Sequence, residues 1–317
     1  MRRNLVSLGA LLGAYLLFAV LIRRDTGGFS FLSPANLELV LRQTAIVGTA
    51  ALGMTLIIAA GGIDLSAGAV IALTTVVVAS SLNAGFSPLA AGALGIAAGA
   101  AAGAVNGLLV TALGVVPFIV TLGTMLAVRG VAKGLAHEQK VDAPASWLNE
   151  MLAVLPPDRR WLVFPPGVWL MLVLALVVAV LLNYTRFGRH VLAVGSNPSA
   201  ARLAGVRVDW VKRTVYWLGG ILVGTAGVLQ FGRLSVGDPT VATGLELDII
   251  AAVVIGGASL SGGEGWVLGS LLGALIMTTI RAGGSQLGWS NWLQEIVTGI
   301  IIVVAVAIDR IRHRRET

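Results

Sequence analysis

The sequence predicts an all-α protein that crosses a membrane about ten times. Of its 317 residues, 56% are apolar and only 12% are charged. Nearly charge-free segments recur along the chain, each of about 18 residues or more and so long enough to cross the hydrocarbon core as a helix. The basic residues fall mainly between these segments. This pattern excludes a soluble protein, and the continuous apolar segments exclude an outer-membrane barrel, whose strands alternate in hydrophobicity.

The predicted spans are the apolar segments that lie between Gly, Pro and charged residues. They cover about 4–22, 36–59, 66–82, 88–112, 116–134, 165–183, 214–233, 244–258, 266–281 and 291–309. The first span follows Met1-Arg2-Arg3 and imitates a signal peptide. Arg23 and Arg24 stand where a small-residue cleavage site is expected, so we expect an uncleaved span.

Charge distribution predicts the topology. Segment 184–213 carries six basic residues against one acid, Asp209, and the chain after residue 309 is also basic. By the positive-inside rule both segments are cytoplasmic, and so is the N-terminus with its two arginines. Segment 135–164, whose charges nearly balance, then lies outside. The net charge of +7 is therefore a topology signal rather than a nucleic-acid surface, and residues 1–317 form one transmembrane domain.

Asp64 is the only charged residue between Arg42 and Arg129. It follows Gly61-Gly62, where the chain is free to leave helical geometry. One interpretation is structural, because Asp is a favoured cap and its carboxylate accepts from amides that open a helix. The other is functional, because an ionisable group at membrane depth usually faces a polar cavity. The sequence leaves both open.

Glycines form two further patterns. Gly95, Gly99, Gly103 and Gly107 recur every four residues and form one flat helical face, suited to close packing inside the chain or at a subunit interface. The pattern GGxxLS occurs at 61–66 and again at 256–261, each time after an apolar segment. This echo suggests a weak parallel repeat of the kind found in transporters.

Segment 184–213 contains a predicted short helix. Asn197 caps well and Pro198 suits the first turn, so we expect a helix over 199–203 that Gly205 ends. A short capped helix in a basic loop is either a docking element or a plain surface helix.

Polar residues near or inside other spans also have two interpretations each. Asp238, Glu246 and Asp248 precede or open a span, where acids favour the positive end of a helix or meet an external partner. Polar groups inside spans line a path for a hydroxyl-rich solute or bond a neighbouring helix. These groups are Asn106, Thr121, Thr124 and Gln230.

No catalytic motif is present in the sequence. It has no GxxxxGK[ST] phosphate loop, no HExxH, no cysteine, and three separated histidines. We therefore expect no enzyme activity, no metal site and no bound cofactor. If ATP drives transport, another chain must hydrolyse it.

Four blocks in the same order resemble the membrane permeases of ribose-type monosaccharide ABC importers. The blocks are GMTLIIAAGGIDLSAGAVIAL, VPFIVTLGTMLAVRG, AVGSNPSAARLAGVRVDWVKRTVYW and GLELDIIAAVVIGGASLSGGEGWVLGSLLGALI. The resemblance runs from about Phe31 to Ile308. It implies a subunit of the bacterial inner membrane with a ten-helix fold similar to that of the cobalamin importer permeases.

The resemblance also implies partners and roles. A periplasmic binding protein would deliver the sugar, a second permease copy or paralogue would pair with this chain, and a cytoplasmic ATPase would bind ATP and magnesium. The implied coupling helix comprises Ser196, Asn197, Pro198, Ser199, Ala200, Ala201, Arg202, Leu203, Ala204 and Gly205. The expected path or gate residues are Gly61, Gly62, Asp64, Ser66, Asn106, Phe118 and Thr121. Asp238, Glu246 and Asp248 would contact the binding protein. The alternative function is a proton-coupled secondary carrier that uses Asp64.

Overall fold

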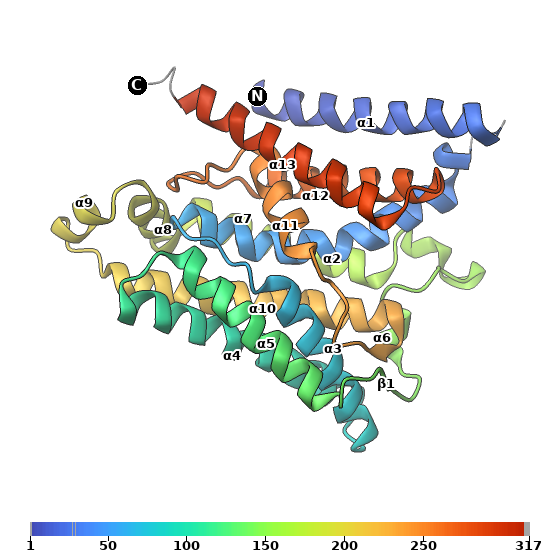
Figure 1. Ribbon diagram of the computed structural model, residues 1–317, viewed down its shortest axis with the longest axis horizontal. Coiled ribbons are helices and arrows are strands. Elements are labelled where there is room, and N and C mark those ends of the chain that lie inside the picture. The colour runs from blue at the N-terminus through green and yellow to red at the C-terminus, as the bar shows by residue number, and fades with distance from the viewer. Residues whose placement is uncertain (1, 27, 29, 314–317) are drawn as a thin grey trace.

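The computed structural model describes residues 2–26, 28 and 30–313, and it is mostly helical. Each predicted span coincides with one long or medium helix. These helices are α1 (Arg2–Thr26), α2 (Pro34–Ala59), α3 (Ala67–Asn83), α4 (Pro88–Leu113), α5 (Pro117–Leu135), α7 (Pro166–Tyr184), α10 (Val208–Leu234), α11 (Leu245–Ile255), α12 (Val267–Gln286) and α13 (Asn291–His313). Most of them run roughly along the long axis of the molecule (Figure 1).

Short elements fill the connections. They are η1 (Ser30–Leu32), β1 (Val141–Asp142), α6 (Trp147–Glu150), η2 (Pro157–Leu162), α8 (Arg186–Ser196), α9 (Pro198–Leu203) and β2 (Val236–Gly237). The two strands pair antiparallel, with Val141 opposite Gly237. Helices α8 and α9 project at one end of the bundle, and α6 and β1 lie at the opposite end (Figure 1).

Seven helices in the described part of the chain are long and apolar enough to cross a membrane, namely α1, α2, α4, α5, α7, α10 and α12. Helix α3 and the apolar part of α13, Asn291–Ala307, are shorter. Helix α11 has 11 residues, which span only about 16 Å. Length and composition therefore define seven spans directly.

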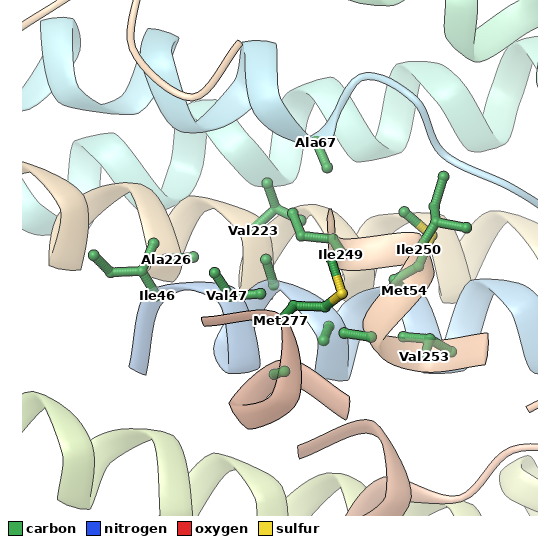
Figure 2. Close-up of a cluster of buried hydrophobic side chains, with 14 of the residues drawn as sticks. Ile46, Val47, Met54, Ala67, Val223, Ala226, Ile249, Ile250, Val253 and Met277 are labelled. Atoms are coloured by element: carbon green, nitrogen blue, oxygen red, sulfur yellow. The ribbon is translucent and has the colours of Figure 1, made fainter. Parts of the chain in front are cut away.

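Helices α2 and α10 form the centre of the bundle, because 83% of the membrane-length segment of each is buried. Figure 2 shows side chains of Ile46, Val223, Ile249 and Met277, from α2, α10, α11 and α12, meeting in one cluster. This apolar cluster holds together helices that are far apart in the sequence.

The glycine ladder of α4 packs against α10 within the chain. A Cβ added at Gly99 would lie 2.6 Å from the carbonyl oxygen of Gly220, and one at Gly103 would lie 2.3 Å from the carbonyl oxygen of Tyr216. The two backbones therefore touch with no side chain between them, which only glycine permits. The ladder thus serves helix packing inside the chain.

Candidate functional site

The GGIDLS segment interrupts the bundle between α2 and α3. The amide of Gly61 donates to Ile58 O and that of Gly62 donates to Ile57 O, both at 2.9 Å. Gly61 has φ of +77°, a left-handed conformation that glycine adopts without strain. These hydrogen bonds terminate α2, and residues 62–66 are not helical.

Asp64 lies inside this break and is only 3% exposed. Its Oδ1 accepts from the Ser66 amide at 2.8 Å, from Ser66 Oγ at 2.6 Å and from Asn106 Nδ2 at 3.3 Å. Asn106 Nδ2 also donates to Ser66 Oγ at 2.9 Å. The carboxylate therefore joins the break to α4 through a buried polar network.

The capping interpretation of Asp64 needs correction in detail. Helix α3 begins at Ala67, so Ser66 occupies the cap position, and its side chain makes no capping bond. Asp64 accepts the Ser66 amide one residue before the helix, as in an Asx turn. In this conformation Oδ1 of the carboxylate faces its three hydrogen-bond donors.

The Ile63 carbonyl oxygen is held from two sides. Tyr216 Oη donates to it at 3.2 Å from α10, and Thr121 Oγ1 donates at 3.1 Å from α5. Phe118 lies one turn before Thr121 on α5 and is 46% exposed. The structure thus brings Gly61, Gly62, Asp64, Ser66, Asn106 and Thr121 together at one break, while Phe118 stands at its margin.

A junction of glycines connects this break to α8. We name Gly61, Gly195, Gly262 and Gly263 the glycine junction. A Cβ added at Gly195 would lie 1.9 Å from Ala59 O, and one at Gly262 would lie 2.9 Å from Gly61 Cα. The Gly263 amide donates to Ala59 O at 3.0 Å. The last turn of α8 therefore contacts the first GGxxLS loop at Gly61 and the two glycines that follow the second loop, Gly262 and Gly263, through backbone atoms.

Helix α9 follows α8 directly and has the predicted caps. Asn197 Oδ1 accepts from the Ala200 amide at 3.0 Å, and Pro198 opens the helix. Gly205, with φ of +84°, ends it. Ala201 is buried, whereas Leu203 is 91% exposed. An almost fully exposed leucine at the end of a capped helix is available for contact with another chain.

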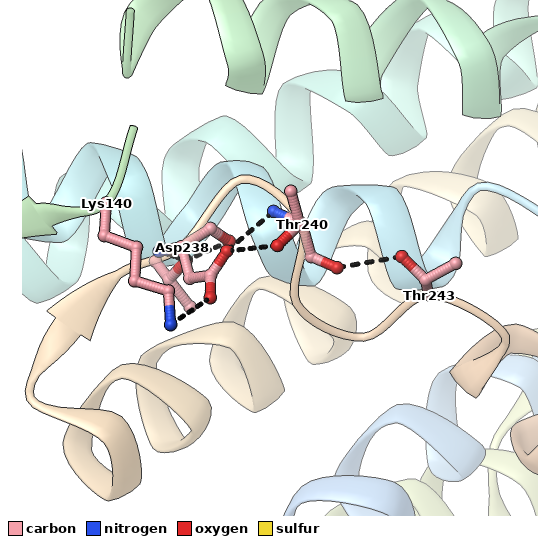
Figure 3. Close-up of polar contacts among 5 residues, drawn as sticks. Lys140, Asp238, Thr240 and Thr243 are labelled. Carbon is pink, nitrogen blue, oxygen red and sulfur yellow. Dashed lines mark hydrogen bonds and ion pairs between the residues drawn. The ribbon is translucent and has the colours of Figure 1, made fainter. Parts of the chain in front are cut away.

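The three acids expected to contact a binding protein are not exposed at the surface. Asp238 accepts from the Thr240 amide at 2.8 Å and pairs with Lys140 at 3.3 Å (Figure 3). Glu246 is partly buried and accepts from the Gly244 amide at 3.2 Å. Asp248 is 0% exposed and pairs with Arg281 of α12. Their contact with a partner stays a prediction.

Several residues of the site were not predicted. Tyr216 and Gly195 carry contacts to the break, and Arg129 donates to Val241 O at 2.7 Å, which fixes the segment before α11. Helix α8 was expected as loop. Its signal was present, because Gly188, Val191 and Val194 recur at helical spacing and are buried.

A bundle with membrane-length helices and a buried polar network at a helix break is typical of membrane transport proteins. Residues 36–306 match the family described as "branched-chain amino acid transport system / permease component". The chain belongs to this permease family. It is a multi-pass protein of the bacterial inner membrane, as predicted.

The relatives refine this assignment. The chain is 40% identical to the ribose import permease protein of Escherichia coli K12 over 280 residues, which are 88% of this chain and 87% of that protein. It is 41% identical to the ribose import permease protein of Bacillus subtilis over 304 residues, 96% and 92% of the two chains. The galactose/methyl galactoside import permease protein of Escherichia coli K12 is 36% identical over 318 residues, 95% and 93%.

These matches confirm the predicted resemblance and favour an importer permease over a proton-coupled carrier that uses Asp64. No solved structure gave a significant match to the chain.

Proposed function

We propose that the chain is the membrane-spanning permease subunit of an ABC importer that moves a monosaccharide from periplasm to cytoplasm. The names of its relatives support this substrate class, since they include permeases for ribose, L-arabinose, fructose and galactose. Family membership and coverage of most of each relative support the same transport role.

The proposed topology has ten spans and two cytoplasmic termini, as in the cobalamin importer permeases. Helices α3, α11 and α13 would complete the seven longer spans. Segment 184–213, with α8 and α9, would be cytoplasmic because of its basic residues, and segment 135–164 would be periplasmic. Residues 1–317 then act as one permease domain.

The proposed partners follow from membership of the importer permease family. It has no phosphate loop, so a cytoplasmic ATPase would bind ATP and magnesium and hydrolyse the nucleotide. A periplasmic binding protein would deliver the sugar, and a second permease copy or a paralogue would complete the path. The chain itself would hold no cofactor and catalyse no reaction.

The observation that carries the proposal is the connection between α9 and the GGIDLS break. Helix α9 presents Leu203 to solvent, and α8 immediately before it contacts the first GGxxLS loop and the glycines after the second one at the glycine junction. An ATPase that moves α9 would therefore move backbone next to Asp64 without an intervening side chain. Closely packed backbones transmit such shifts because they cannot deform continuously.

The mechanism requires the ATPase to bind the two conformations of the permease with different affinity, since only a differential interaction shifts an equilibrium. The break at 61–66 would open or close the path as α2, α3 and α8 shift together. Gly61, Gly62, Asp64, Ser66, Asn106, Phe118 and Thr121 are the proposed path or gate residues.

Substitutions in α9 and at Gly205, which ends it, test this proposal. Leu203→Asp, Gly205→Pro and Arg202→Glu should each abolish ATP-driven uptake while ATP hydrolysis by the assembled transporter becomes independent of sugar. The control is Arg186→Glu, which reverses an exposed charge in the same loop but outside α9. Normal uptake by all three variants in well-inserted protein would contradict the docking role of α9.

A further inference from the structure

A polar cavity lies at the end of the bundle opposite α9. Its volume is about 340 Å³, and α2, α10, α12, α13 and the segment before α11 line it. Arg233, at its mouth, stands in the last turn of α10. The 27 residues of α10 place this mouth about 40 Å from the start of that helix beside α9. In the proposed topology the cavity therefore opens toward the periplasm.

Gln230 lines this cavity, and its side chain makes no hydrogen bond with the described chain. It is only 7% exposed. Its neighbours differ, because Thr278 Oγ1 donates to Ala274 O at 2.9 Å and Gln294 Nε2 donates to Trp289 O at 3.1 Å. The amide atoms of Gln230 are not sealed from solvent, so water or a bound molecule in the cavity can complete their hydrogen bonds.

The rest of the lining matches a hydroxyl-rich molecule. Gln43, like Gln230, offers an amide donor and acceptor without a partner in the described chain, and Ile46 and Val47 form an apolar floor. Arg281 is neutralised by Asp248. Arg233 has no acidic partner among the described residues, but it is exposed to solvent. Amides beside a small apolar surface suit the hydroxyls and the C–H face of a sugar ring.

We propose that this outer polar cavity binds one neutral monosaccharide inside the permease, with Gln230 and Gln43 as its recognition groups and Arg233 as a donor at its mouth. Its volume lies at the lower end of the range of small-molecule sites, which fits one sugar ring. The proposal rests on the proposed function, since it makes the cavity a receiving site on the outer side of the path.

Binding to the full-length permease in lipid nanodiscs, without ATPase or binding protein, tests the cavity alone. The probes are D-ribose and D-galactose, and saturation-transfer NMR measures their affinity. Gln230→Leu should weaken binding of at least one sugar about tenfold, because it removes hydrogen bonds from the ligand. The matched control, Gln139→Leu, changes an exposed glutamine outside the cavity and should bind as wild type does.

Thermal unfolding distinguishes a role of Gln230 in sugar binding from a merely structural role. Leucine has a similar volume, and it replaces an amide that makes no hydrogen bond with the described chain, so Gln230→Leu should unfold at about the same temperature as wild type. Equal binding by Gln230→Leu and wild type would overturn the proposal.

Two other results would also overturn the cavity proposal. The first is binding of the sugar acid D-galacturonate alone, lost in Arg233→Gln, which would make the cavity an anion site. The second is no sugar binding by wild type at tens of millimolar probe. If ATP-driven uptake by the complete transporter persists in that case, the proposed importer function stands without the cavity. Sugar binding without ATP-driven uptake by the complete transporter would instead support the cavity site and contradict the proposed importer function.

Discussion

Asp64 stabilises the helix break by accepting hydrogen bonds, and its negative charge is not required for that role. The Ser66 amide, Ser66 Oγ and Asn106 Nδ2 all donate to the same oxygen, Oδ1. Asparagine keeps an acceptor oxygen in this position, whereas leucine keeps the shape without any acceptor. The two substitutions therefore separate hydrogen bonding from charge.

Asp64→Asn should fold and take up sugar with an unchanged pH profile between about pH 6 and 8. Asp64→Leu should lose about 1–3 kcal/mol of stability, because it strands the Ser66 amide and the Asn106 side chain in a buried site. Uptake assays and thermal unfolding in detergent measure both effects. A proton relay would instead require that Asp64→Asn abolish uptake or shift its pH dependence.

Asp238 gives a pH-dependent prediction outside the membrane-spanning helices. Burial raises the pKa of its carboxyl. Hydrogen bonds from Thr240 and the Lys140 ammonium lower this pKa by more than burial raises it, so the net pKa lies below the usual value (Figure 3). A depressed folded pKa stabilises the protein above the unfolded pKa, about 3.9, and this stabilisation is lost as the pH falls.

The unfolding temperature of wild type should therefore exceed that of Asp238→Asn at neutral pH, and the difference should shrink below about pH 4. Tryptophan fluorescence during heating measures it. The control is Asp142→Asn, since the Asp142 side chain has no hydrogen bond or ion pair in the described chain. If the difference in unfolding temperature between wild type and Asp238→Asn does not change with pH, the Asp238 carboxylate does not provide this pH-dependent stabilisation.

At the scale of elements, the contact of α4 with α10 depends on backbone approach. Gly99→Ala should destabilise the protein by about 1–3 kcal/mol, because the new Cβ would lie 2.6 Å from Gly220 O and the helices must separate. Gly130→Ala is the control in α5, where no atom lies within 4 Å of the added Cβ. It should be neutral or stabilising. Equal unfolding temperatures for both variants would contradict this packing.

The elements that could be predicted from the sequence are those whose signals lie in adjacent residues. Apolar length predicted the long helices within a few residues, and Asn197, Pro198 and Gly205 predicted the bounds of α9, because caps act on adjacent residues. The start of α10 at Val208 and the amphipathic helix α8 were missed, because basic residues in both were assigned to a loop.

At the scale of the whole molecule, the functional arrangement depends on contacts between distant segments. The glycine junction joins residues 61, 195 and 262, and the outer polar cavity needs side chains from α2, α10, α12 and α13. Gln230 and Asn106 were recognised as polar groups inside spans, but periodicity did not say which would find a partner. Only the packed structure shows that Asn106 Nδ2 donates within the buried network at the helix break, whereas Gln230 lines the outer polar cavity.

The central claim is that α9 docks a cytoplasmic ATPase, and the absence of cysteine allows a direct test. A single cysteine replaces Ala200, whose position in α9 is exposed. A short thiol-to-amine crosslinker is applied in native membranes, and mass spectrometry identifies the captured chain. We expect an ATPase subunit, captured from Ala200→Cys but not from the exposed control Gln139→Cys. Well-inserted protein that reacts with soluble thiol reagents yet captures no ATPase would contradict the account.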